Sequence, residues 1–232
     1  MSSGTSQRVW EIDALRGIAL VLMIIFHFIF DLDEFYGFPV RYNSGVYYYI
    51  GKVSAILFML ISAVSCAFSS SNIKRALKFL GVAMAITVGT HLYNPAFGIK
   101  FGILHFLGIC ILLYPLFRDL NKYVLAILGT IIIIVGRYFG EMQVHNNYWF
   151  LFNLTGNTWV SADYYPLFPW LGVFLYGIAL GKILYHRKQS RLTWRPGTNL
   201  FGFIGRRTLL VYLIHQPLLL LLIGIYVKLK GE

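Results

Sequence analysis

Stretches of about 20 mostly apolar residues recur along the whole chain, and they constrain its fold more than any other feature. A helix needs about that many residues to cross the hydrocarbon core of a bilayer, which is roughly 30 Å thick, because each residue adds about 1.5 Å. We therefore expect about seven membrane-spanning helices. Their expected ranges are Trp10–Asp31, Tyr47–Ser69, Ala76–Leu92, Phe101–Phe117, Tyr123–Tyr138, Phe168–Tyr185 and Thr208–Val227.

The composition indicates that lipid is the solvent for much of the chain. Of the 232 residues, 58% are hydrophobic and 12% are charged, which is more apolar surface than a soluble domain of this length can bury. Strands of a membrane barrel would alternate apolar and polar residues, but runs such as Ile18–Phe30 and Ile131–Val135 do not. No linker rich in Pro, Ser or Gly divides the chain. The sequence thus predicts an all-α membrane protein, a single bundle that forms one domain over residues 1–232.

The Lys and Arg residues are distributed unevenly about the expected spans. Six of the 20 flank one face of the membrane, and the other fourteen flank the opposite face. The six are Arg41, Lys52, Lys100, Arg137, Lys228 and Lys230. Because cytoplasmic loops carry the excess of positive charge, we expect the amino terminus in the cytoplasm and the carboxyl terminus outside. We expect no nucleic-acid partner despite the net charge of +11, because no interleaved basic and aromatic pattern exists outside the spans.

The connection formed by residues 186–207 lies on the expected inner side and is rich in Arg. A segment of this kind usually contacts anionic lipid headgroups. The alternative is a binding site for a phosphorylated cytoplasmic ligand, because the guanidinium group matches the geometry of a phosphate. Both interpretations stay open at this point.

The first expected span carries four ionisable side chains, although each costs at least about 2.5 kcal/mol near the centre of a membrane helix. Asp13 and Arg16 lie near its inner end, three positions apart, so an ion pair at the interface is one interpretation. His27 and Asp31 lie toward its outer end, four positions apart and therefore on one helical face. A carboxylate there can fix the tautomer of the imidazole and raise its basicity. A lone histidine in a membrane helix more often serves packing or hydrogen bonding, but the aspartate one turn away gives more weight to a catalytic role.

Three further histidines, His91, His105 and His215, lie in or at the ends of other spans. They come from separate helices and show no paired ligand spacing, so we expect no metal site. Cys66 and Cys110 also fall within spans and are expected as small core residues rather than as a disulfide.

Several short motifs resemble one family of membrane enzymes. Residues 11–17 (EIDALRG), followed by Met23 and His27, resemble the opening of the heparan-alpha-glucosaminide N-acetyltransferase family. The ten residues between Arg16 and His27 are similar to the first-helix motif of the wider transmembrane acyltransferase superfamily. Further stretches resemble the second-helix pattern, the late Tyr-Leu-x-His-x-Pro signature and a segment typical of small prokaryotic members. These are residues 58–62 (FMLIS), 212–217 (YLIHQP) and 163–172 (DYYPLFPWLG).

The resemblance implies transfer of an acyl group, usually acetyl, from cytoplasmic acyl-CoA to an amine or hydroxyl of a sugar or glycan outside. It also implies a multi-pass protein of a prokaryotic cell membrane. The sequence departs from the lysosomal members, which place their catalytic histidine in the loop after the first helix. Residues 32–46 contain no histidine, so the superfamily motif assigns this role to His27.

The same resemblance suggests how acetyl-CoA would be held. Arg16 would bind its phosphates at the inner mouth, while His27, about 16 Å further along the helix axis, would meet the thioester. Arg206 and Arg207 would supplement the anion site.

Three other residues receive weaker roles. His105 and His215 would orient the pantetheine arm or the acceptor, and Asp163 would bind an acceptor amine at an outer helix entrance.

We therefore expect an acyl-CoA-dependent N- or O-acyltransferase in which His27, oriented by Asp31, acts as general base or as transient acyl carrier. The alternative is a small proton-coupled transporter in which the same residues relay protons. Transporters commonly show inverted repeats, which this chain does not plainly show. A non-enzymatic lipid-binding or scaffold role is a third hypothesis. The acceptor, the acyl chain length and the formation of a homo-oligomer are left open by the sequence.

Overall fold

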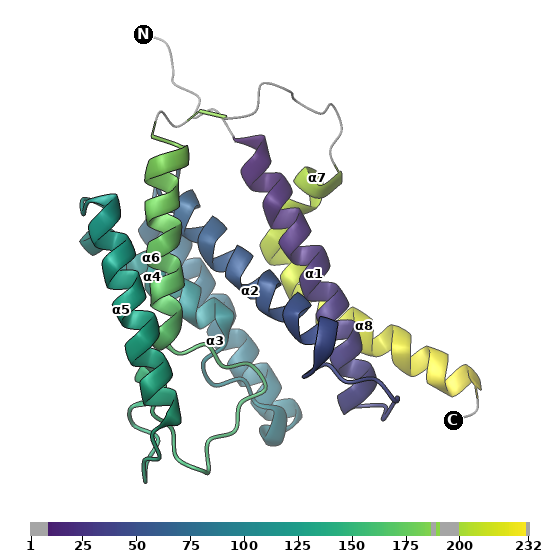
Figure 1. The fold of residues 1–232 in the computed structure, drawn as a ribbon. Helices are drawn as coiled ribbons and strands as arrows, with labels where there is room; N and C mark the ends of the chain where they lie inside the picture. The colour runs from purple at the N-terminus through teal and green to yellow at the C-terminus, as the bar shows by residue number, and fades with distance from the viewer. Residues whose placement is uncertain (1–8, 187–188, 191–199, 231–232) are drawn as a thin grey trace. The chain divides into compact units, whose positions relative to one another are not determined.

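The computed structural model describes residues 9–186, 189–190 and 200–230 (Figure 1). Within these residues the chain forms eight α-helices and two short 3-10 helices, η1 (Pro95–Phe97) and η2 (Phe150–Phe152). The α-helices are α1 (Trp10–Glu34), α2 (Gly45–Cys66), α3 (Asn72–Tyr93), α4 (Ile103–Phe117), α5 (Lys122–Glu141), α6 (Leu167–Leu184), α7 (Leu200–Arg206) and α8 (Thr208–Lys230). The predicted all-α class is confirmed.

Of the helices in the described part of the chain, six are long and apolar enough to cross a membrane: α1, α2, α3, α5, α6 and α8. Each lies on one of the expected segments, so the prediction of a multi-pass integral membrane protein is confirmed. The remaining expected segment, Phe101–Phe117, contains α4, which has 15 residues. A helix of that length is about 22 Å long, shorter than the roughly 30 Å hydrocarbon core. A crossing by α4 and the sides on which the termini lie therefore stay predictions.

The helix boundaries follow local capping chemistry. The Ser71 side chain accepts a hydrogen bond from the Lys74 amide at the start of α3, and the Asn121 side chain accepts one from the Tyr123 amide at the start of α5. These side chains satisfy amides that have no partner within their own helix, which favours helix starts at these residues.

The chain divides into two compact units, which we describe separately. The first unit consists of residues 1–61 and 190–232, and the second unit consists of residues 62–189. The prediction of a single domain over residues 1–232 stays a prediction.

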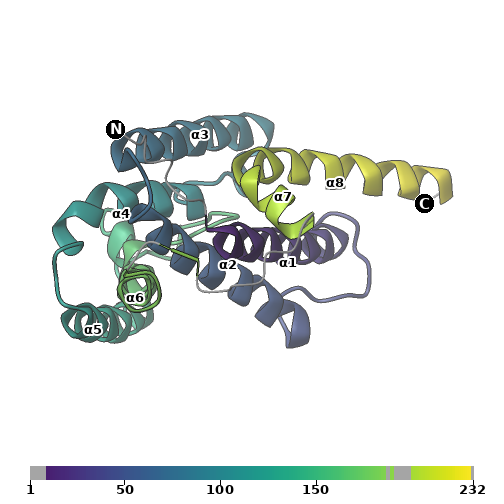
Figure 2. The same cartoon turned by 90° about the horizontal axis from the view of Figure 1, so that it is seen from above.

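In the first unit, α1 packs against α7 and α8, and α7 lies beside the first half of α1 (Figure 2). Two glycines allow the closest approach, since a Cβ atom at Gly17 would overlap the Phe201 carbonyl oxygen and one at Gly205 would overlap the Asp13 carbonyl oxygen. Small residues at helix interfaces are typical of membrane bundles, where close backbone packing supplies much of the attraction. Helix α7 was not expected from the sequence, and these glycines explain how a seven-residue helix is held.

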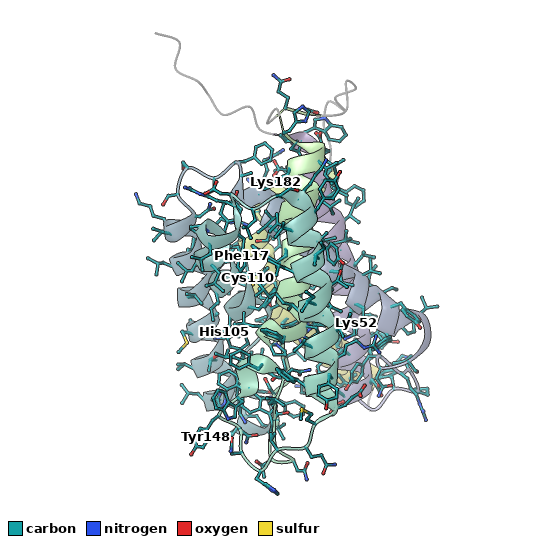
Figure 3. The ribbon with its side chains drawn as sticks, turned by 60° about the vertical axis from the view of Figure 1, so that its left-hand side comes forward. Lys52, His105, Cys110, Phe117, Tyr148 and Lys182 are labelled. Atoms are coloured by element: carbon teal, nitrogen blue, oxygen red, sulfur yellow. The ribbon has the colours of Figure 1, made fainter. Side chains whose placement is uncertain are left out.

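In the second unit, α3 packs on α4 and α5 packs on α6. Gly129 of α5 and Gly172 of α6 face each other so closely that a Cβ atom on Gly129 would lie 2.9 Å from the Gly172 carbonyl oxygen. The two helices are also joined by a hydrogen bond of 2.6 Å between the hydroxyls of Thr130 and Tyr176. Cys110 lies along α4, is fully buried and is free (Figure 3). Cys66 is likewise buried and free, as expected.

Candidate active site

Four polar side chains from α1 and α8 meet within the first unit. His27 and Asp31 lie one turn apart on α1, and His215 and Gln216 are consecutive residues of α8. The His27 and His215 ring centroids are 4.9 Å apart, with the rings inclined at 76°. Gln216 Nε2 donates a hydrogen bond of 2.5 Å to Asp31 Oδ1. The packing of α1 on α8 thus brings together three of the residues predicted from the sequence, His27, Asp31 and His215.

The hydrogen bonds of the two imidazoles assign their tautomers. His27 Nδ1 lies 2.9 Å from the Met23 carbonyl oxygen, and His215 Nδ1 lies 2.6 Å from the Tyr212 carbonyl oxygen. A carbonyl oxygen only accepts, so Nδ1 carries the proton in both rings. Each neutral ring then presents the lone pair of Nε2, the atom that a general base uses.

Asp31 has a different partner from the one expected from its spacing. The sequence predicted that its carboxylate would hold the second nitrogen of His27, but that nitrogen, Nδ1, is bound to the Met23 carbonyl of the preceding turn. The Asp31 carboxylate is fully buried and accepts from Gln216 of α8. His27 Nδ1 is satisfied by the backbone of its own helix. The Asp31 carboxylate can therefore accept from a side chain of the neighbouring helix.

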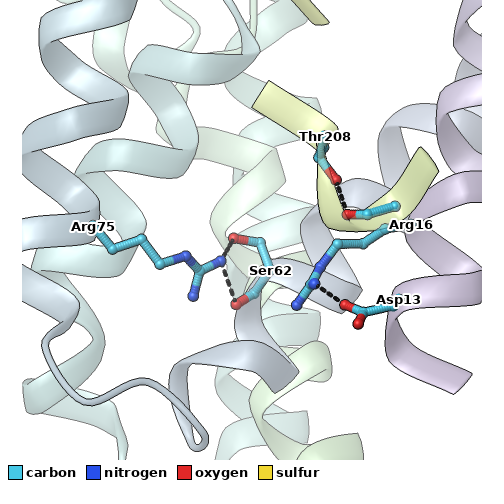
Figure 4. Close-up of polar contacts among 6 residues, drawn as sticks. Asp13, Arg16, Ser62, Arg75 and Thr208 are labelled. Atoms are coloured by element: carbon cyan, nitrogen blue, oxygen red, sulfur yellow. Dashed lines mark hydrogen bonds and ion pairs between the residues drawn. The ribbon is translucent and has the colours of Figure 1, made fainter. Parts of the chain in front are cut away.

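The amino-terminal half of α1 carries a short ion pair. Arg16 Nη1 donates to Asp13 Oδ1 over 2.6 Å, with Asp13 buried and Arg16 half-buried (Figure 4). The interface pairing considered from the sequence is therefore present. Anion binding by Arg16 stays a prediction.

Arg206 and Arg207 lie at the junction of α7 and α8 and are both exposed. Their guanidinium carbons lie 5.9 Å and 4.1 Å from the centre of the Phe203 ring. They directly follow Gly205, where a Cβ atom would overlap the Asp13 carbonyl oxygen, so their backbone lies beside the amino-terminal half of α1. Thr208, whose hydroxyl donates to the Gly205 carbonyl, closes α7 immediately after them (Figure 4).

Two predicted site residues, His105 and Asp163, belong to the second unit and contact the start of α4. The Ile103 amide donates to Asp163 Oδ2 over 2.9 Å, so this carboxylate satisfies a free amide at the helix start. Burial raises the pKa of the Asp163 carboxyl to about 6, and the hydrogen bond from Ile103 opposes that shift. His105 Nδ1 accepts from the Gly102 amide, so its Nε2 carries the proton and donates to the Thr87 hydroxyl over 3.3 Å. Both side chains therefore have structural partners, and their roles in ligand binding stay predictions.

Sequence reasoning missed two further polar residues. Gln216 is a neutral amide at an unspecified position of the late signature, so an argument based on the cost of charge in the membrane passes over it.

Arg75 was counted only among the fourteen basic residues expected on the inner face. In the second unit its Nη2 donates to the Ser62 hydroxyl over 2.7 Å and to the Ser62 carbonyl over 3.3 Å (Figure 4). Ser62 belongs to the second-helix motif, and its presence there could have indicated that it has a polar partner such as Arg75.

Among the residues that the structure describes, no group of three or more His, Cys, Asp or Glu side chains could hold a metal ion.

The comparison with protein families confirms the resemblance found in the sequence. The family model described as "Heparan-alpha-glucosaminide N-acetyltransferase, catalytic" matches residues 8–217. The chain belongs to this family. The match includes α1 and the start of α8, so it contains all four residues of the His27–Gln216 cluster. No curated protein and no solved structure matches the chain.

The heparan-alpha-glucosaminide N-acetyltransferase catalytic family is an acetyl-CoA-dependent N-acetyltransferase domain. Binding of such a co-substrate by the side chains of the first unit stays a prediction. Exposed guanidinium groups are suited to phosphates, and an imidazole with a free lone pair is suited to proton removal beside a thioester.

Proposed function

We propose that this chain is a membrane acetyltransferase that moves an acetyl group from cytoplasmic acetyl-CoA to an amine or hydroxyl of an extracytoplasmic sugar. Family membership supports the reaction class. The observation that carries the proposal is the pairing of His27 with His215, two neutral imidazoles that share one cluster and each present Nε2 as a base. We place the protein in a prokaryotic cell membrane.

Arg16, assisted by Arg206 and Arg207, holds the phosphates of acetyl-CoA at the cytoplasmic end of α1. All three are in the first unit, and the contact between Gly205 and Asp13 brings α7 against this part of α1. Arg presents a planar fork of donors that matches phosphate oxygens, so it gives both affinity and orientation. The rise of about 16 Å from Arg16 to His27 then lets the thioester reach the cluster.

His27 Nε2 removes a proton from the acceptor nitrogen or oxygen as that atom attacks the acetyl carbonyl carbon. The new bond joins the acceptor atom to this carbon, and the carbon–sulfur bond breaks. The thiolate that leaves takes the proton from the imidazolium, which restores neutral His27. In the second mechanism considered, the acetyl group passes first to His27 Nε2 and then to the acceptor.

Asp31 fixes α8 against α1 through Gln216 and so keeps His215 beside His27. His105 and Asp163 remain proposed contributors to the pantetheine arm and to acceptor binding. Their structural bonds at the start of α4 do not require that function, so their substitution tests it separately.

The purified protein in nanodiscs, incubated with acetyl-labelled CoA and a panel of amino sugars and their hydroxyl counterparts, tests the function. We expect a labelled sugar and stoichiometric free CoA. Label that accumulates on His27 without an acceptor supports the acyl-carrier route, and its absence during turnover supports the general-base route. Proton flux in proteoliposomes with no acetyl transfer would instead favour the transporter.

A further inference from the structure

Three buried polar atoms of the α1–α8 cluster have no hydrogen-bond partner within the part of the chain that the structure describes. They are Asp31 Oδ2, His215 Nε2 and Gln216 Oε1. Asp31 is completely buried and His215 is 7% exposed. Buried polar groups in proteins are almost always hydrogen-bonded, so three unpaired atoms on neighbouring side chains indicate that a further molecule is bound there.

All three unpaired atoms are acceptors. His215 Nδ1 donates to the Tyr212 carbonyl, which leaves Nε2 with a lone pair. Gln216 donates through its Nε2 to Asp31 Oδ1, so its unpaired atom is the amide oxygen. The ionised carboxylate of Asp31 only accepts. The missing partner must therefore supply hydrogen-bond donors.

The burial of these atoms limits the size of that partner. Asp31 and His215 are covered by protein on all sides, whereas His27 is only half-buried. A large acceptor can approach His27, but only a small molecule fits against His215 Nε2. Water is the smallest donor, and buried water typically bonds two to four polar groups that otherwise lack partners.

We propose that Asp31, His215 and Gln216 hold a water molecule beside His27, and that this water attacks acetyl-CoA when no acceptor is bound. The protein would then have a second activity, as an acetyl-CoA hydrolase. The inference rests on the proposed function, which brings the thioester to His27, and goes beyond it by adding a second nucleophile and a second base.

His215 is the base of this second reaction. The attacking water donates one hydrogen bond to His215 Nε2 and the other to the Asp31–Gln216 pair, whose two side chains are positioning residues. The His215 ring lies 4.9 Å from the His27 ring, centre to centre, so a water on its Nε2 is close to the thioester that His27 meets.

The hydrolysis consumes one water and one acetyl-CoA. The water oxygen forms a bond to the acetyl carbonyl carbon as one water proton passes to His215 Nε2. The carbon–sulfur bond breaks, and the departing thiolate takes that proton from the imidazolium, which restores neutral His215. The second water proton stays on the acetic acid, which releases it to bulk solvent. The products are acetate and the free thiol of CoA.

The purified protein in nanodiscs, given acetyl-CoA without any acceptor in water labelled with heavy oxygen, tests this reaction. Acetate and free CoA are measured together, and empty nanodiscs give the blank rate. His215→Gln removes the base and keeps a polar side chain, and Asp31→Asn alters the carboxylate that positions the water. The matched control is His91→Gln, since His91 Nδ1 likewise bonds a backbone carbonyl but lies in the second unit.

We expect acetate and free CoA in equal amounts, roughly a hundredfold faster than the blank, with one heavy oxygen atom in each acetate. His215→Gln should bring the rate close to the blank. Asp31→Asn should lower kcat for hydrolysis roughly tenfold and leave KM for acetyl-CoA within about twofold, because it disturbs the water and not the coenzyme. His91→Gln should match the parent. Should His215→Gln fail to fold, as judged by size exclusion, Asp31→Asn decides the question.

Hydrolysis of an acetyl group carried by His27 would also give labelled acetate, and His27→Ala separates the two routes. This variant should lose transfer to an amino sugar but still release acetate, because the base that activates the water is His215. Acetate formation that is lost in folded His27→Ala and kept in folded His215→Gln would overturn the proposed water site.

The outcome also separates this inference from the proposed function. Acetyl transfer to a sugar with no acetate above the blank would overturn the hydrolase activity and leave the proposed function intact. Acetate formation that depends on His215, with no transfer to any acceptor, would support the water site and contradict the proposed function. The absence of both products would overturn both.

Discussion

Asp31 and Gln216 lie 185 positions apart in the chain and are joined by a hydrogen bond of 2.5 Å. The bond links the carboxyl-terminal half of α1 to the middle of α8 and is buried at its carboxylate end. Because His215 precedes Gln216, the same packing sets the His215 ring against His27. A single interhelical contact thus connects Asp31, which the sequence singled out as an ionisable residue of a span, to Gln216, which it did not.

The close contact of α1 with α7 leads to a prediction about stability. Gly17→Ala should destabilise the protein by about 1–3 kcal/mol, because the new methyl group meets the Phe201 carbonyl oxygen, which is backbone and has little freedom to move. Gly81→Ala is the matched control, since a Cβ atom at that helical glycine meets nothing within 4 Å. The control should be neutral or slightly stabilising, because Ala has the higher helix propensity. Thermal unfolding in detergent measures both. Equal melting temperatures for the two variants would contradict the α1–α7 packing.

Asp163 gives the protein a predicted pH dependence of stability. Its pKa in the folded protein, about 6, lies above its ordinary value of 3.8, so the folded state holds this proton more tightly than the unfolded state does. Stability from this group should therefore be fully present below about pH 4, fall as the pH rises from about 4 to 6, and stay level above that. In Asp163→Asn this pH-dependent part of the stability should be absent, as measured by melting temperatures between pH 4 and 8.

The control for Asp163 is Asp119→Asn, at an exposed carboxylate that pairs with Arg118 on the surface. This variant should keep the parental pH profile. A profile for Asp163→Asn that matches the parent over the whole range would show that the buried carboxylate does not titrate in this window.

Arg16 should affect acetyl-CoA binding more than a peripheral cation does. Arg16→Ala should weaken acetyl-CoA binding roughly tenfold or more, because a methyl group cannot replace charge-assisted bonds to phosphate. The affinity of Arg16→Lys for acetyl-CoA should lie between those of the parent and of Arg16→Ala, since lysine keeps the charge and loses the planar fork. Calorimetry on folded protein measures the affinities, with Lys122→Ala as the control. The comparison requires a folding check, because Asp13 is buried and loses its ion-pair partner in Arg16→Ala. Equal affinities in Arg16→Ala and Lys122→Ala would remove Arg16 from the site.

Membrane topology provides a prediction that also tests α4. With the amino terminus inside and seven crossings, a reporter near Gln189 should be cytoplasmic and one after Glu232 should be external. If α4 does not cross, both locations reverse, because one crossing is lost before each position. The basic connection of residues 186–207 would then be external, against the positive-inside distribution. Two reporters on the same side would contradict the crossing by α8.

The spans could be predicted from the sequence because helix length and apolar composition are local properties. Helix α7 could not, since its seven residues include two glycines and end at Arg206, and the pattern resembles a loop. Its formation depends on packing against α1, where Gly17 and Gly205 let the backbones meet. Tertiary contact outweighed local propensity at this position.

The members of the His27–Gln216 cluster were predicted more completely than their contacts. The spacing of His27 and Asp31 shows that they share a face of α1, but it does not identify which neighbouring helix supplies a partner. The i−4 carbonyl of Met23 competes for His27 Nδ1, and the long-range partner of Asp31, Gln216, is uncharged. A search for ionisable residues within the spans therefore finds Asp31 and misses Gln216.

His27 is the residue on which the acetyltransferase proposal most depends. Its Nδ1 donates to the Met23 carbonyl, so the ring presents Nε2 as the base, and no other side chain is needed to fix this tautomer. His27→Ala should therefore fold, bind acetyl-CoA with near-parental affinity and transfer acetyl groups about a hundredfold more slowly or worse. The structure also predicts that Asp31→Asn leaves the tautomer of His27 intact, so its effect on the chemical step at saturating acceptor should be smaller than that of His27→Ala. Single-turnover rates with preloaded acetyl-CoA measure that step apart from binding.

His91→Ala serves as the control for His27→Ala. His91 Nδ1 likewise bonds the carbonyl of the preceding turn, that of Thr87, but His91 lies on α3 of the second unit. Parental single-turnover rates in His27→Ala would make His27 a packing residue, and His215, whose Nε2 is buried and unpartnered within the described residues, would be the next base to test.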